Sequence, residues 1–143
     1  MYPTILTLHS WLRWLVILAG LWAVASAAAR RAGDRDRAGR VFTGGLDLQF
    51  VLGVLLFVAL SPITRAALGD MGGAMKNRVW RFWTVEHPAL MILALVFAHV
   101  GRMVSRRSGT GKGPLLWYAL ALLAVLAATP WPFLAHGRPL LRW

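Results

Sequence analysis

The chain has 143 residues, of which 58% are hydrophobic, and its mean hydropathy is +0.59. Soluble domains of this size carry fewer apolar residues, so we expect an integral membrane protein with a single domain, residues 1–143. Lys and Arg number 16 against 5 Asp and Glu, but the basic residues lie mostly between apolar segments. That distribution favours membrane topology and contact with a lipid bilayer over nucleic acid.

Four apolar segments predict an all-α protein, an integral membrane four-helix up-and-down bundle. They cover about residues 4–29, 42–60, 85–104 and 115–130. Each is near the roughly 20 residues that a helix needs to cross the hydrocarbon, although the last is short. The first lacks a basic N-terminal region and is too long for a signal peptide, so we expect an uncleaved anchor.

Two connections are short and basic. The first carries Arg30, Arg31, Arg35, Arg37 and Arg40, and the third carries Arg106, Arg107 and Lys112. Since such loops stay in the cytoplasm, we expect a multi-pass protein of the cell inner membrane with both termini outside. Five tryptophans then lie near the outer interface, where indole rings prefer to sit: Trp11, Trp14, Trp80, Trp83 and Trp131.

The second connection, residues 61–83, is longer and faces outward in this topology. Apolar residues recur within it at three- to four-residue spacing, and polar residues take the other faces. This pattern predicts a short amphipathic helix over about residues 70–83 that lies at the membrane interface.

Two histidines are predicted to share one depth. His9 precedes Arg30 by 21 residues, and His87 precedes Arg106 by 19. At 1.5 Å per residue, both imidazoles lie about 30 Å from the inner helix ends. The first and third segments are parallel and diagonally opposite in an up-and-down bundle, so both side chains can point into it at the same level.

Two histidines at one level on facing helices are the arrangement that holds haem b between two axial ligands. We therefore predict His9 and His87 as metal ligands, with Arg13 beside a haem propionate. Cysteine is absent, which excludes thiolate metal sites, iron–sulfur clusters and covalent c-type haem. The alternative is that both histidines are partly solvated residues at the membrane interface and bind no ligand.

Arg13 lies too deep in the first segment to remain unpaired without cost. Glu86 is the expected protein partner, and it also gains from the helix N-terminus that follows it. A haem propionate or a quinone carbonyl is the alternative partner of Arg13. The predicted outer site thus contains His9, Arg13, Glu86 and His87. An Arg13–Glu86 ion pair that only ties the first and third segments together explains these two residues as well as a ligand contact does.

A second polar layer is predicted nearer the cytoplasm. Asp47 follows Arg40 by 7 residues and His99 precedes Arg106 by 7, so the two lie at similar depth and are expected to form a hydrogen bond. The layer either fixes helix register or belongs to a proton path or quinone pocket. Gln49 is on another face, where it joins this layer or holds helices together.

Copper is the other metal to consider, because thioether and imidazole groups suit Cu(I). The candidate ligands are Met71, Met75, Met91, His87 and His136. Methionine at helical spacing, however, is usually a packing residue. The sequence contains no Ser-His-Asp set, phosphate loop or zinc-type His-Glu-x-x-His motif, so it does not indicate catalysis by the chain alone.

Four motifs carry a family resemblance: His9–Trp14, Asp70–Lys76, Arg81–His87 and Pro130–Phe133. In these motifs the chain resembles a family of small bacterial four-helix membrane proteins that usually carry the name "cytochrome b". The resemblance implies that the first three motifs form one outward-facing site. We therefore expect a small b-type cytochrome, or a cytochrome-like subunit of a larger complex, that relays electrons between quinone and an outer redox partner. The alternative is a non-redox accessory subunit or small-molecule carrier whose His, Glu and Arg cluster is structural.

Overall fold

The computed structural model describes residues 1–29, 36–107 and 112–140. Within these ranges the chain is helical, with turns and one extended terminal segment, and no strand occurs. Four long helices make up most of it: α1 (Tyr2–Ala29), α2 (Arg37–Leu55) with its π-helical continuation η1 (Leu56–Leu60), α6 (His87–Arg107) and α7 (Lys112–Ala128). The all-α prediction is confirmed.

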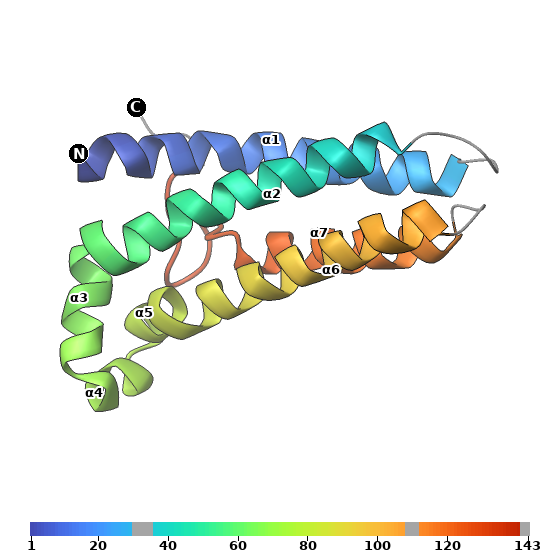
Figure 1. The fold of residues 1–143 in the computed structure, drawn as a ribbon. Helices are drawn as coiled ribbons and strands as arrows, with labels where there is room; N and C mark the ends of the chain where they lie inside the picture. Colours follow the sequence, from blue (N-terminus) through green and yellow to red (C-terminus); the bar gives the residue numbers. More distant parts are fainter. Residues whose placement is uncertain (30–35, 108–111, 141–143) are drawn as a thin grey trace.

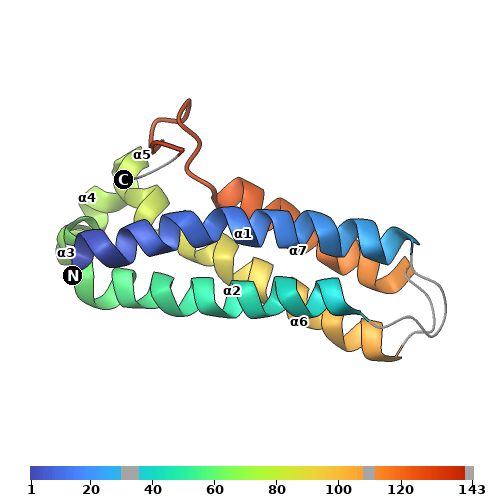
Figure 2. The same cartoon turned by 90° about the horizontal axis from the view of Figure 1, so that it is seen from above.

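The long helices lie side by side and alternate in direction (Figures 1 and 2). Helices α1 and α6 each pack against α2 and α7, which places α1 and α6 diagonally opposite one another. We call one end of this arrangement the basic end, because Arg37, Arg40, Arg106, Arg107 and Lys112 lie there. We call the other the histidine end, because it holds His9 and His87.

Small side chains fill much of the interior, whereas large apolar side chains face outward. Buried alanines occur on all four long helices, among them Ala23, Ala38, Ala94, Ala98 and Ala121. Exposed apolar side chains include Leu15, Leu18, Val51, Val58, Ile92, Val96 and Leu123. This inverted pattern is typical of helices that pack closely together in lipid.

Three described helical stretches are long and apolar enough to cross a bilayer: Tyr2–Ala29, Arg37–Leu60 and Arg78–Arg107. The fourth apolar helix, α7, is shorter at 17 residues. The second and third stretches begin earlier than predicted, at Arg37 instead of residue 42 and at Arg78 instead of residue 85. The arginines at positions 30, 31 and 35, on which the cytoplasmic assignment partly depended, lie outside the described residues.

The prediction of one amphipathic helix over residues 70–83 is wrong. Residues 70–83 instead contain two short helices, α4 (Met71–Lys76) and α5 (Arg78–Arg81), and the start of a π-helical turn. With the preceding short helix α3 (Pro62–Gly69), they project at the histidine end (Figure 1). A side-chain cap starts each of them, because Ser61, Asp70 and Asn77 accept hydrogen bonds from the first backbone N–H groups of α3, α4 and α5 respectively. The π-helical turn η2 (Phe82–Glu86) then joins α5 to α6.

The segment after α7 returns across the histidine end towards α1 and α5 (Figures 1 and 2). Arg13 Nη2 and Trp14 Nε1 of α1 both donate to the Leu140 carbonyl oxygen at 2.9 Å. The His136 ring stacks on Phe82, with ring centroids 3.4 Å apart. Burial lowers the pKa of the His136 imidazole, which therefore favours the neutral form.

Candidate functional site

His9 and His87 meet inside the histidine end, as the spacing of the sequence predicts. Their ring centroids are 6.3 Å apart, and the ring planes differ by 70°. A metal bonded to both rings at about 2 Å from each nitrogen separates the two centroids by roughly 6 Å. The same separation is also that of a direct edge-to-face ring contact, which is the contact that this structure contains.

His87 is oriented by the end of α7. Its Nδ1 atom lies 2.8 Å from the carbonyl oxygen of Ala128. A carbonyl oxygen only accepts, so Nδ1 carries the hydrogen and Nε2 carries the lone pair of the neutral ring. A hydrogen bond from one ring nitrogen to a backbone carbonyl is the usual outer-shell support of a metal-binding histidine.

His9 is oriented by the buried Gln49 of α2. The Gln49 Nε2 atom lies 3.1 Å from the His9 carbonyl oxygen and 3.3 Å from His9 Nε2. An amide nitrogen only donates, so His9 Nε2 accepts from it and the proton of the neutral ring sits on Nδ1. This buried Nδ1 atom has no hydrogen-bond partner among the described residues.

A cavity of about 300 Å³ opens between the long helices beside the two rings. Its polar lining includes His9, Arg13, Gln49, His87 and Arg138, and most of the remaining lining is apolar. Gly53 exposes bare backbone to His9, since a Cβ atom there would lie 3.4 Å from His9 Cε1. The size is at the lower end of the range for small-molecule sites.

The predicted Arg13–Glu86 ion pair does not form within the described chain. Glu86 Oε1 accepts from Arg81 Nε at 2.7 Å, and Arg13 donates to the Leu140 carbonyl oxygen instead. Glu86 does not line the cavity. Arg138, which sequence reasoning missed, does line it and lies 5.3 Å from the centre of the Trp83 ring.

The candidate copper ligands come from three separate segments, α4, α6 and, for His136, the segment after α7. Met91 and His87 line the cavity, whereas Met71 and Met75 belong to the separate short helix α4. Among the described residues there is no group of three or more His, Asp or Glu side chains that could hold a metal ion. The cavity lining therefore offers two imidazoles, His9 and His87, and the thioether of Met91 as soft donors, a set that suits a metal that brings its other ligands with it.

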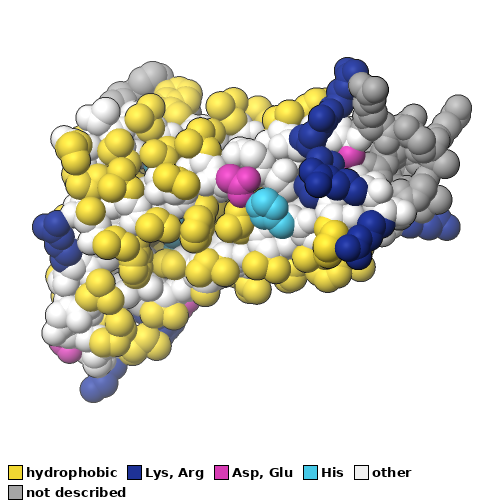
Figure 3. Space-filling model, viewed as in Figure 1, with side chains coloured by type: hydrophobic (Ala, Val, Ile, Leu, Met, Phe, Trp, Pro, Cys, Tyr) yellow, Lys and Arg dark blue, Asp and Glu magenta, His cyan; other side chains and the backbone are white. Residues whose placement is uncertain are grey.

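The second polar layer forms as predicted between α2 and α6. His99 Nε2 lies 2.8 Å from Asp47 Oδ1, and both side chains are about half exposed, at 54% and 51%. Figure 3 shows a carboxylate and a histidine side by side among hydrophobic side chains on this face. Gln49 does not belong to this layer, because it is buried and bonds to His9.

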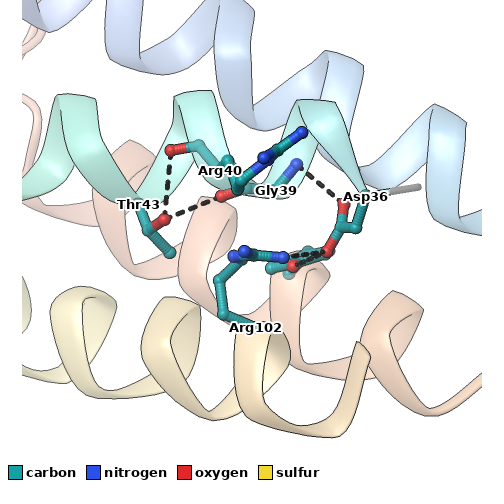
Figure 4. Close-up of polar contacts among 6 residues, drawn as sticks. Asp36, Gly39, Arg40, Thr43 and Arg102 are labelled. Carbon is teal, nitrogen blue, oxygen red and sulfur yellow. Dashed lines mark hydrogen bonds and ion pairs between the residues drawn. The ribbon is translucent and has the colours of Figure 1, made fainter. Parts of the chain in front are cut away.

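A further polar cluster at the basic end was not predicted. Asp36 accepts hydrogen bonds from the backbone N–H of Gly39 at 2.9 Å and from Arg102 Nη1 at 3.3 Å (Figure 4). The Tyr118 hydroxyl of α7 also donates to Asp36. The position of Asp36 just before α2 is a helix-capping signal, but its long-range partners are not visible in the sequence.

No protein-family model, curated protein or solved structure matches this chain. The resemblance to small cytochrome b-like membrane proteins therefore depends on the four motifs alone. The functional argument depends on the geometry around His9 and His87.

Proposed function

We propose that this chain is a four-span membrane protein of the b-type cytochrome kind, with haem b bound near the histidine end. The observation that carries the proposal is the meeting of His9 and His87 beside the cavity. The two rings come from diagonally opposite helices, so no local sequence constraint brings them together. Placing two imidazoles beside a cavity inside a membrane-length bundle costs desolvation free energy. Ionisable side chains in such positions usually belong to a functional site.

The residues present fit this group. His9 and His87 would be the axial ligands, and the cavity-lining Arg13 and Arg138 would pair with the propionates. The His9 Nδ1 atom is buried without a hydrogen-bond partner among the described residues, so the polar capacity of this ring is incompletely used. Haem b held in this way supplies reversible one-electron transfer.

The chain contributes orientation and shielding. The Ala128 carbonyl fixes the His87 ring, and the Gln49 amide holds the α1 backbone through the His9 carbonyl oxygen. The terminal segment is tied to α1 through Leu140 and to Phe82 through His136, so it covers the site from one side. A covered apolar site limits access of water and thereby influences redox potential.

The membrane setting completes the proposal. Helix α7 is the fourth span, and the basic end faces the cytoplasm according to the distribution of Arg and Lys. The histidine end then lies near the outer face of the inner membrane with both termini outside. In this position, a quinone in the bilayer and an outer redox protein, or a larger complex, are the electron partners.

One observation favours the second candidate, a non-redox subunit or carrier with a structural histidine cluster. The Gln49 amide already donates towards His9 Nε2, the nitrogen that usually binds haem iron, and the two rings already touch. Ligation through this nitrogen requires Gln49 to release it. The two candidates therefore differ in the expected effect of removing Gln49.

The test is the visible spectrum of detergent-purified protein, dithionite-reduced minus oxidised, before and after titration with haemin. We expect Soret and α bands in the wild type, and their loss in His9→Ala and in His87→Ala. His99→Ala is the matched control and should keep the bands, since His99 lies outside the cavity. Gln49→Leu should bind haemin at least as tightly as the wild type, because it frees His9 Nε2.

A well-folded wild type that stays colourless, lacks metal and takes up no haemin would overturn the cytochrome proposal. In that outcome His9→Ala and Gln49→Leu should both lower the melting temperature without any spectral change. This result would leave the histidine cluster as a helix-packing device, as the second candidate requires.

A further inference from the structure

A basic groove lies between α2 and α6 at the basic end, separate from the histidine cavity. Its volume is about 650 Å³, and it shares no lining residue with that cavity. Figure 3 shows basic side chains gathered on this face next to the exposed carboxylate and histidine. The groove is lined by Arg40, Thr43, Gly44, Asp47, His99, Arg102, Met103, Arg106 and Arg107.

The charges in the groove are not balanced. Arg102 pairs with Asp36, and Asp47 pairs with His99. Arg40, Arg106 and Arg107 are exposed and have no ion-pair partner within the described ranges. Three guanidinium groups at one groove favour an anion, and their planar donor forks match phosphate oxygens in particular.

The part of the groove nearer the histidine end contains a polar pair, Asp47 and His99, which favours a ligand with polar groups there. Asp47 follows Arg40 by 7 residues, so it lies about 10 Å further towards the histidine end. The Asp47–His99 pair is half exposed on a face that we assign to lipid, where charged groups are costly unless a polar group covers them. Beside the pair, a Cβ atom on Gly44 would meet nothing within 4 Å, so the floor of the groove is open there.

We propose that this groove binds the headgroup of an anionic phospholipid. The phosphate lies among Arg40, Arg106 and Arg107, and the glycerol and ester groups cover the Asp47–His99 pair. The acyl chains then follow the exposed apolar side chains of Leu48, Val51 and Val96 towards the bilayer centre. Basic pockets between membrane helices are established sites for such headgroups.

Two other ligands fit the groove less well. A quinone has a neutral head and gives no role to three unpaired arginines. A soluble phosphate compound uses the arginines, but it leaves the Asp47–His99 pair and the apolar side chains beyond it uncovered. An amphiphile with an anionic head satisfies both parts of the groove. This inference does not depend on haem binding, because the two sites share no residue.

The test uses the full-length protein in a mild neutral detergent, with dioleoyl phosphatidylglycerol or dioleoyl phosphatidylcholine added in mixed micelles. Bound lipid is counted by native mass spectrometry, and thermal unfolding is followed in parallel. We expect retained phosphatidylglycerol and a higher melting temperature with this lipid only. The double variant Arg106→Gln/Arg107→Gln should bind it at least roughly 100-fold more weakly, because two charge-assisted hydrogen bonds to the phosphate are lost.

The matched control is Arg37→Gln/Lys112→Gln, which removes the same charge from the same end but outside the groove. It should bind phosphatidylglycerol like the wild type. The proposal would be overturned if this control lost as much phosphatidylglycerol as the groove variant, or if the wild type bound phosphatidylcholine equally well. It would also be overturned by an equal rise of the melting temperature with inorganic phosphate alone, or by a lipid-independent dimer that covers the groove. Retention of the lipid by the groove variant would do the same.

Discussion

At the scale of single residues, Asp36 joins three helices at the basic end (Figure 4). It caps α2 through Gly39, contacts α6 through Arg102 and α7 through Tyr118, and its side chain is only 8% exposed. Removing one member of a buried, hydrogen-bonded ion pair leaves the other member uncompensated. The three helix contacts therefore depend on one carboxylate.

We expect Asp36→Ala to lower the free energy of unfolding by about 3–5 kcal/mol, because Arg102 keeps its charge in a buried position without its partner. Tyr118→Phe removes a single hydrogen bond and should cost about 1 kcal/mol. The measurement is denaturant unfolding of both variants in the same detergent. Equal, small losses for the two variants would show that water or detergent replaces the carboxylate.

The histidine pair was predictable from sequence, whereas its surroundings were not. Helical rise and two basic landmarks suffice to place His9 and His87 at one depth. The choice of hydrogen-bond partners depends on rotation about each helix axis, which spacing to a loop does not determine. Of the two roles that the sequence leaves open for Gln49, the structure shows the one that holds helices together, through His9. Glu86 was paired with Arg13, although the nearby Arg81 takes its carboxylate.

At the scale of whole helices, close approach of α6 and α7 depends on Gly101. A Cβ atom at this position would lie 2.7 Å from two Tyr118 ring atoms and 3.2 Å from Trp117 Cβ. The Tyr118 ring is held in a packed interface and cannot move aside without a large loss of packing energy. A side chain at position 101 would therefore push the two helices apart. Small residues at such contacts are the main means of packing helices in lipid.

We expect Gly101→Ala to lower the unfolding free energy by about 1–3 kcal/mol through overpacking. Gly44→Ala is the matched control, because its Cβ would meet nothing within 4 Å and alanine is the better helix former. It should leave stability unchanged or slightly higher. Thermal unfolding of the two alanine variants in parallel checks the contrast, and an equal loss in both would refute the close-approach argument.

Helix existence was easier to predict than helix boundaries. Long apolar runs identified all four long helices, but α2 starts at Arg37 because Asp36 caps it, and the third stretch extends back to Arg78 through η2. The segment over residues 70–83 has helical periodicity, and Asp70 caps its start, but Asn77 acts as a second cap within the pattern and divides it. Capping residues inside a periodic segment therefore outweighed periodicity.

At the scale of the molecule, the two ends differ in chemistry and the middle is apolar. The basic end carries the basic groove, and the histidine end carries the cavity and its covering segment. For the proposals above, the orientation of this axis decides which leaflet would supply the lipid and which compartment would supply the electron partner. The chain has no cysteine, so single introduced cysteines report the orientation without background.

We expect a membrane-impermeant maleimide to label Lys76→Cys and Leu140→Cys in intact spheroplasts, and Lys112→Cys only after lysis. All three positions are exposed and lie outside the long apolar stretches. Lys76 and Lys112 flank the third stretch, so their difference shows that it crosses the membrane. Leu140 tests α7, whose 17 residues span about 26 Å as a helix, slightly less than the hydrocarbon thickness.

The cysteine-free wild type is the control for background labelling. Labelling of Lys112→Cys alone in intact spheroplasts would invert the orientation and move the histidine end to the cytoplasmic side. Labelling of Lys76→Cys without Leu140→Cys would show that α7 does not cross. In that case α7 would lie against the other helices as a buried hairpin arm, and the chain would have three spans.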